Sequence, residues 1–231
     1  AYQQSKLLNT NTRYLHESIL DYASNLIDKL PEKLTTCFFT NSGSESNDLA
    51  LRIARLYNNS KESIVMSGAY HGHTNSLIDI SPYKFFGSGG GGKKDFVHVV
   101  PMPDEFAGEH LDAESNFGDY YITVLKNKID KIKKDGKKLA FFIIEPIMGC
   151  GGQVIIPSDF MKEAFVLVKE AGGLFIVDEV QIGFGRVGTH FWGFEMSSVQ
   201  PDIVTLGKSI GNGHPLSAVI TTKHIAETFN N

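Results

Sequence analysis

Hydrophobic positions recur in two alternating patterns along the chain, and these predict a succession of strands and helices. Apolar residues at helical spacing predict helices at 18–30, 49–57, 120–134 and 158–171. Short segments rich in apolar residues predict strands at 34–40, 63–67, 96–101, 140–144, 173–177 and 202–206. The runs at 140–144 and 173–177 are continuously apolar, as expected for strands covered on both faces. The pattern therefore predicts an α/β fold, with a mostly parallel sheet and helices on both faces.

Composition narrows the choice of partners. The chain has 231 residues, 42% of them hydrophobic and 21% charged, and a formal net charge of −4. This mild charge gives no reason to expect a nucleic-acid or anionic-membrane partner. The longest apolar run, 139–144, is far shorter than the roughly 20 residues that span a bilayer. The two cysteines, Cys37 and Cys150, indicate neither a disulfide framework nor a metal cluster, so we expect a reducing, cytoplasmic compartment.

The turn Ser42-Gly43-Ser44 lies between a predicted strand and a predicted helix. Such a turn points several backbone N–H groups at one place, and the helix N-terminus adds about half a positive charge. The serine hydroxyls can donate further hydrogen bonds, so this turn is a candidate phosphate site. The other interpretation is that Ser42 or Ser44 only caps the helix, with Glu45 assisting.

Asp178 directly follows the apolar run 174–177, so it emerges from a buried strand, where a free carboxylate is costly. Such a carboxylate needs a cationic partner or several hydrogen bonds. A protonated pyridine nitrogen would be a suitable partner, because the carboxylate would keep that ring cationic as an electron sink. An aspartate that only binds backbone N–H groups is the alternative.

Lys208 follows the predicted strand 202–206 and is flanked by Gly207 and Gly211. If a strand end delivers a lysine into a closed site, desolvation disfavours its charged form. The amine can then attack a carbonyl group near neutral pH. An ordinary surface lysine is the alternative for any single lysine, but the apolar strand before Lys208 and its glycine neighbours favour a functional role.

Three other features have weaker interpretations. Tyr70 follows a predicted strand and could stack on a flat heterocycle, or belong to the core. The pair His71 and His73 could suggest a metal site, but no third ligand stands at a recognisable spacing, so we expect no metal. The glycine run 89–92 lacks both the preceding strand and the following Lys-Ser/Thr of a phosphate-binding P-loop, so we interpret it as a surface loop.

In their order along the chain, these motifs resemble the class III (fold type I) aminotransferase family, whose enzymes depend on pyridoxal 5′-phosphate. The resemblance covers nearly the whole chain and is carried by residues 41–48, 70–73, 145–146, 178–186 and the segment around Lys208. It implies that Lys208 holds the cofactor as a Schiff base and that Asp178 pairs with its pyridinium nitrogen. It also implies a set of cofactor-binding residues: Ser42, Gly43 and Ser44 at the phosphate, Tyr70 stacked on the ring, Gln181 at the ring hydroxyl, and His71, Glu145 and Val180 around them. Glu145 is expected to support Asp178 and Gln181.

Within that family the chain is similar to phospho-lyases that act on ethanolamine phosphate and hydroxylysine phosphate. Segments 77–85, 150–153 and 211–215 carry this similarity. Cys150 stands where many family transaminases have a glutamate, and Met148 stands where glutamine is common. The thiol removes a charge that can pair with an arginine, which weakens the case for ordinary exchange between amino acids and keto acids.

The resemblance implies one cofactor-binding large domain over residues 1–231, as a fragment without the family's N-terminal segment and small C-terminal domain. It also implies a homodimer or a dimer of dimers. We therefore expect an enzyme that acts on a small primary amine through Lys208, with elimination of phosphate as its reaction. The alternatives are a transaminase that passes the amino group to a keto acid, and a non-catalytic module with the same fold. The presence of both Lys208 and Asp178 argues against the last.

Overall fold

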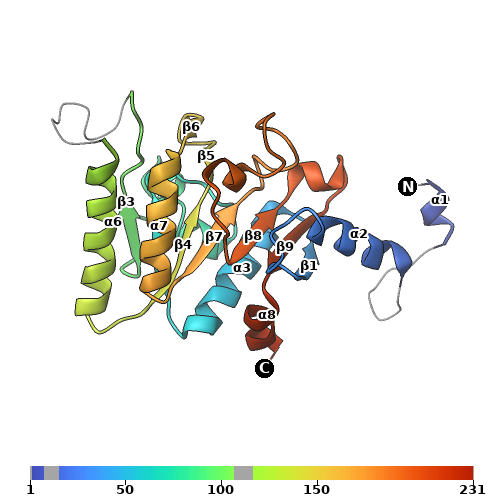
Figure 1. Cartoon of the computed structure of the whole chain (residues 1–231), viewed down its shortest axis with the longest axis horizontal. Coiled ribbons are helices and arrows are strands. Elements are labelled where there is room, and N and C mark those ends of the chain that lie inside the picture. Colours follow the sequence, from blue (N-terminus) through green and yellow to red (C-terminus); the bar gives the residue numbers. More distant parts are fainter. Residues whose placement is uncertain (1, 8–15, 107–116, 231) are drawn as a thin grey trace.

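A computed structural model describes residues 2–7, 16–106 and 117–230. Its centre is a seven-stranded sheet with the strand order β1-β9-β8-β7-β4-β2-β3 (Figure 1). The bounds of these strands are β1 Thr36–Thr40, β2 Glu62–Met66, β3 Val97–Val100, β4 Leu139–Ile144, β7 Leu174–Asp178, β8 Ile203–Leu206 and β9 Ser217–Thr221. The short strands β5 (Ile147–Met148) and β6 (Val154–Ile155) form a separate antiparallel pair.

The mostly parallel α/β sheet predicted from the sequence is confirmed, and all six predicted strands are present within two residues of their expected bounds. Strands β3, β2, β4, β7 and β8 pair in parallel. The prediction missed β9, which pairs antiparallel with both β8 and β1. It also missed the small β5–β6 pair. Since β1 and β8 are both antiparallel to β9, β1 runs in the same direction as β8.

The four predicted helices are present as α2 (Glu17–Ile27), α3 (Gly43–Asn58), α6 (Phe117–Lys134) and α7 (Ser158–Glu170). Helix α2 ends three residues earlier than expected, because residues 28–30 continue in tight turns after Ile27. The shorter helices are α1 (Tyr2–Ser5), α4 (Asn75–Ile78), α5 (Pro82–Phe85), α8 (Lys223–Asn230) and the 3₁₀ turns η1 (Gly193–Ser197) and η2 (Lys208–Gly211). Among the described helices, none combines the length and the hydrophobicity needed to cross a membrane.

Helices cover both faces of the sheet. Helices α6 and α7 pack side by side on one face, and α3 and α8 pack on the other (Figure 1). The continuously apolar sequence of β7 follows from this arrangement, because its residues alternate between the two cores. Phe175 and Val177 join the core beneath α6 and α7, whereas Leu174 and Ile176 join the core beneath α3. Each face is therefore buried, as the apolar runs predicted.

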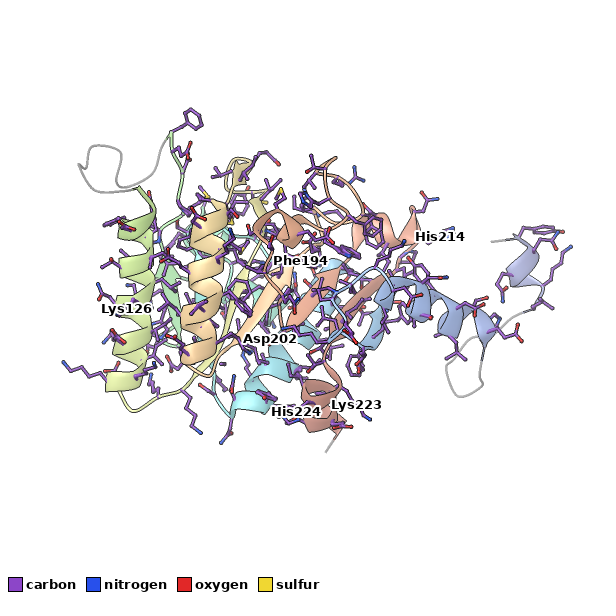
Figure 2. All side chains as sticks on the ribbon, in the orientation of Figure 1. Lys126, Phe194, Asp202, His214, Lys223 and His224 are labelled. Carbon is purple, nitrogen blue, oxygen red and sulfur yellow. The ribbon has the colours of Figure 1, made fainter. Side chains whose placement is uncertain are left out.

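The parallel strands bring distant parts of the sequence to one edge of the sheet. Strands β1, β7 and β8 run in the same direction, so the residues that follow them meet at their carboxyl ends. Asp202, labelled in Figure 2, stands beside the start of β8 and marks the opposite edge. There its carboxylate accepts two hydrogen bonds of 2.8 Å from Lys169 of α7 and one of 2.9 Å from the backbone N–H of Phe175. These bonds tie α7 to the starts of β7 and β8.

Candidate active site

The turn between β1 and α3 is held by capping hydrogen bonds. The Ser42 hydroxyl accepts a hydrogen bond of 3.2 Å from the Glu45 N–H, so the predicted capping role of Ser42 is real. The Glu45 carboxylate accepts from the Asn41 N–H at 2.7 Å. Helix α3 has 16 residues, so its positive end is well developed at this turn. Ser42, Gly43 and Ser44 all line one cavity with this helix end.

Close packing of backbone explains the glycines here. A Cβ atom on Gly43 would lie 2.6 Å from Val180 Cγ1. A Cβ atom on Gly207 would lie 3.1 Å from both the Gly43 Cα and Val180 Cγ1. Carbon atoms pack best at about 3.5–4.0 Å, so side chains at either position would force these segments apart. Glycine at these two positions thus allows three segments to pack closely: the turn after β1, the residues after β7 and the end of β8.

Asp178 is only 4% exposed and is surrounded by donors. Its Oδ2 accepts hydrogen bonds from Asn47 Nδ2 at 2.8 Å and from His71 Nδ1 at 2.9 Å. Because a carboxylate only accepts, this contact places the proton of His71 on Nδ1. Oδ1 accepts from the Val180 N–H at 3.1 Å and from the Thr205 hydroxyl at 3.5 Å, which is the limit of a hydrogen bond. This oxygen therefore retains capacity for another donor.

Two buried polar atoms near Asp178 have no hydrogen-bond partner among the described residues. They are Asn47 Oδ1 and His71 Nε2. Both residues line the cavity and both already hold Asp178 through their other polar atom. A buried polar atom without a partner costs free energy, so these atoms indicate a site built to receive a polar ligand.

Glu145, at the end of β4, differs from the expectation. We expected it to support Asp178 and Gln181, but its oxygens instead accept hydrogen bonds of 3.2 Å from the N–H groups of Tyr70 and Gly149. The reason is that two carboxylates are both acceptors, whereas backbone N–H groups can satisfy a buried one. Burial raises the pKa of Glu145 above its ordinary value, and the charge of Asp178 adds to this, while His71 acts in the opposite direction. Glu145 therefore holds the segment that carries Tyr70.

Lys208 begins η2 and is separated from the end of β8 only by Gly207, and its Nζ donates a hydrogen bond to Gln181 Oε1. Its φ of 46° is unusual for a residue other than glycine. The lysine lines the same cavity as Asp178, so the strand ends bring the two together. The sequence predicted that Lys208 would lie in a closed site. In the structure Lys208 is exposed, since no described residue covers its side chain.

The cavity encloses about 250 Å³, and all ten residues predicted from the sequence line it. Four more residues line it that the sequence did not single out as ligand-binding: Asn47, Gly72, Gly149 and Cys150. Asn47 lies within segment 41–48, which carries the family resemblance. It is a polar residue on the buried side of the amphipathic helix α3, and this feature could have identified it as a site residue. Within the described residues, no group of three or more His, Cys, Asp or Glu side chains is placed to hold a metal ion. His71 and His73 instead contact Asp178 and Ser44.

The fold and the site together define an α/β protein whose strand ends, helix N-terminus, buried aspartate and lysine surround one cavity. The chain belongs to the class III aminotransferase family, whose model matches residues 1–231. A Drosophila melanogaster protein named "Alanine--glyoxylate aminotransferase 2-like" is 44% identical over 98% of this chain and 47% of its own length. The Caenorhabditis elegans protein "Ethanolamine-phosphate phospho-lyase homolog 1" is 41% identical over 97% of this chain and 51% of its own length.

A solved structure, a phospholyase from Arthrobacter in complex with phosphoethanolamine, has a similar fold. It matches with a TM-score of 0.90 and 35% identity over 99% of this chain and 53% of its own. The chain thus spans about half the length of the relatives it matches.

The cofactor of this family is pyridoxal 5′-phosphate, and the cavity fits that group. The end of α3 and its two serines suit a phosphate. Oδ1 of buried Asp178 has capacity for a cationic ring nitrogen, and the unpartnered atoms of Asn47 and His71 lie beside it. Lys208 presents its amine to the same cavity, where an aldehyde could be bound.

Proposed function

We propose that the protein is a pyridoxal 5′-phosphate enzyme that eliminates phosphate from a small primary amine of the phosphoethanolamine type. One observation carries this proposal: Lys208, Asp178 and the N-terminus of α3 line a single cavity, although they come from three different parts of the sequence. An amine nucleophile, a buried carboxylate and an anion site are the three groups that this cofactor requires.

The residues of the cavity divide the binding of the cofactor between them. Ser42, Gly43 and Ser44 hold its phosphate at the N-terminus of α3. The other ligands would hold the ring: Tyr70 would stack on it, Asp178 would pair with its nitrogen and Gln181 would approach its hydroxyl, while His71, Glu145 and Val180 fix these neighbours. Lys208 would bind the aldehyde carbon through its amine.

When bound, the cofactor supplies an electron sink for charge that develops on the substrate carbon next to nitrogen. The chain supplies the proton transfers. Lys208, once its nitrogen is free, takes the proton from that carbon as a general base, and Gln181 positions the lysine through its Oε1. Asp178 would present a buried carboxylate to the ring nitrogen, and Asn47 and His71 hold that carboxylate by hydrogen bonds.

With a phosphate ester on the adjacent carbon, the electron pair left by the proton expels that phosphate. The carbon–oxygen bond to phosphate breaks, and water then replaces the amino group. For phosphoethanolamine the balanced sum is one substrate and one water giving acetaldehyde, ammonia and inorganic phosphate.

Cys150 favours elimination over amino-group exchange. It lines the cavity, and its pKa is raised by burial and by the charge of Glu145, so the thiol stays neutral. The wall therefore presents no carboxylate at this position. A relative named as a phospho-lyase homolog and a structural neighbour that holds phosphoethanolamine support the same choice. Transamination is the second candidate, because a 44% identical relative is named as an aminotransferase.

The test uses the full-length protein loaded with pyridoxal 5′-phosphate and incubated with phosphoethanolamine. We expect phosphate and acetaldehyde to appear in equal amounts, and Lys208→Ala to abolish both. If amino groups pass to a keto acid while no phosphate is released, the elimination proposal is wrong and the second candidate stands.

We also propose that the protein forms a homodimer or a dimer of dimers, which light scattering can measure. Its cytoplasmic location stays a prediction, and a human relative at 40% identity carries the word mitochondrial in its name.

A further inference from the structure

Helix α5 stands directly against the wall of the cavity and is fixed there by two hydrogen bonds. The His71 N–H donates to the Ser81 hydroxyl at 3.1 Å, and Ser81 is completely buried. The Tyr83 N–H donates to the Ala69 carbonyl at 3.2 Å. Because His71 lines the cavity and Ala69 precedes Tyr70, α5 holds a defined position relative to both.

The side chain of Lys84 projects from α5 toward two aromatic rings. Its Nζ lies 5.5 Å from the ring centroid of Tyr70 and 5.4 Å from that of Tyr83. These rings contact each other edge to face, with centroids 6.0 Å apart. Tyr70 lines the cavity, so the ammonium of Lys84 lies beside a ring of the cavity wall. The aromatic pair restricts where the amine can lie, at little cost to its charge.

The charge of Lys84 is not neutralised by its surroundings. Lys84 is exposed, and no carboxylate among the described residues lies within ion-pair distance of it. By contrast, Lys94, which follows in the next loop, lies 3.6 Å from Asp79. The carboxylates of the cavity wall, Glu145 and Asp178, already accept hydrogen bonds from the chain itself.

Cys150, which lines the cavity, lies within electrostatic range of both Lys208 and Lys84. Burial and the charge of Glu145 raise the pKa of its thiol, and the charges of Lys208 and Lys84 act in the opposite direction. Both ammonium groups therefore act on one point of the cavity wall. The two ammonium groups thus offset part of the effect of burial and of the Glu145 charge at this part of the wall.

We propose that the Lys84 ammonium binds the phosphate monoester of the substrate amine beside the cavity, while the substrate nitrogen reacts at Lys208. This inference rests on the proposed function and names the residue that recognises the leaving group. Lys84 acts as a specificity residue: it touches the substrate anion and takes no part in proton transfer. A dianionic monoester gains more from this ammonium than a neutral amine does.

The test measures binding of ethyl phosphate to the full-length, cofactor-loaded enzyme by calorimetry. Ethyl phosphate carries the monoester but no amine, so it binds without reacting, and the bound cofactor already fills its own phosphate site. We expect Lys84→Gln to weaken binding at least tenfold, about 1.4 kcal/mol. Lys84→Arg, which keeps the charge, should remain within about threefold of the wild type.

Lys126→Gln is the matched control. Lys126 is an exposed lysine on α6, far from α5 along the chain, and Figure 2 labels it on that helix. The same loss of charge there should leave binding of ethyl phosphate unchanged.

Two results would overturn the inference: a wild-type enzyme that does not bind ethyl phosphate, or a Lys84→Gln variant that binds it as tightly as the wild type. Phosphate release from phosphoethanolamine by the wild type is measured separately. If Lys84-dependent binding is found without phosphate release, the anion subsite stands and the proposed elimination fails. If phosphate is released equally by wild type and Lys84→Gln, with equal binding, only the role of Lys84 fails.

Discussion

Gly43→Ala tests the close packing that brings the cavity together. The added methyl would lie 2.6 Å from Val180 Cγ1 and 3.0 Å from its Cγ2, so carbon atoms would have to separate by about 1 Å to reach van der Waals contact. Val180 cannot move alone, because its N–H binds Asp178 Oδ1 at 3.1 Å. Overpacking of this kind costs about 1–3 kcal/mol. We therefore expect Gly43→Ala to lower both stability and cofactor affinity.

The assay is a double-mutant cycle with Val180→Ala, measured by urea unfolding and by titration of the apoenzyme with pyridoxal 5′-phosphate. Val180→Ala removes both γ carbons and leaves only the Cβ, which lies 3.4 Å from the new methyl. The double variant should therefore be less destabilised than the sum of the two single variants, by at least about 1 kcal/mol.

Gly118→Ala is the control, because a methyl there meets no atom within 4 Å. We expect it to leave stability unchanged or to raise it by up to about 1 kcal/mol, since alanine favours helix more than glycine. If Gly43→Ala matched this control, or if the effects of Gly43→Ala and Val180→Ala simply added, the packing argument would be refuted.

Three further predictions concern polar and titratable side chains. Asn47→Ala should weaken cofactor binding about tenfold in apoenzyme titrations, because Asp178 loses a donor 2.8 Å from Oδ2; Asn47→Asp, with a second acceptor there, should be worse. Burial raises the pKa of Glu179 from 4.5 to about 7. The protonated Glu179 therefore contributes fully to the free energy of unfolding below pH 4.5, and this contribution is lost as the pH rises through 7. Glu179→Gln should therefore remove about 2–3 kcal/mol from the decline in unfolding free energy between about pH 5 and pH 8, and an unchanged decline would contradict this. Iodoacetamide should alkylate exposed Cys150 well before Cys37, whose pKa burial raises to about 12, as peptide mass spectrometry can show.

Sequence patterns predicted the sheet well where strands are buried on both faces. Strands β4 and β7 have continuous apolar sequences because both of their faces pack against helices. Strand β9 was missed, although residues 218–220 form a short apolar run after the turn-forming segment 211–215. Its antiparallel pairing with β8 and β1 is a property of the whole sheet. Three apolar residues alone do not specify it.

The candidate site was predictable where a residue's position after a strand reveals its role. Asp178 ends β7 and Lys208 stands two residues after the end of β8, and this placement at strand ends was enough to group them. The partners of Asp178 were harder to predict. Asn47 lies 131 residues away in the sequence and reaches it only because α3 packs against the sheet. The hydrogen bonds of Glu145 were not predicted, since spacing does not reveal which donors surround a buried carboxylate.

The central claim is that Lys208 bonds covalently to the cofactor. Reduction of the full-length, cofactor-loaded protein with borohydride makes that bond permanent, and mass spectrometry of its peptides then locates the modified lysine. The account predicts a phosphopyridoxyl group on Lys208 and on no other lysine of residues 1–231, together with loss of the visible absorption band in Lys208→Ala. Modification of a different lysine, or an unchanged visible band in Lys208→Ala, would contradict it.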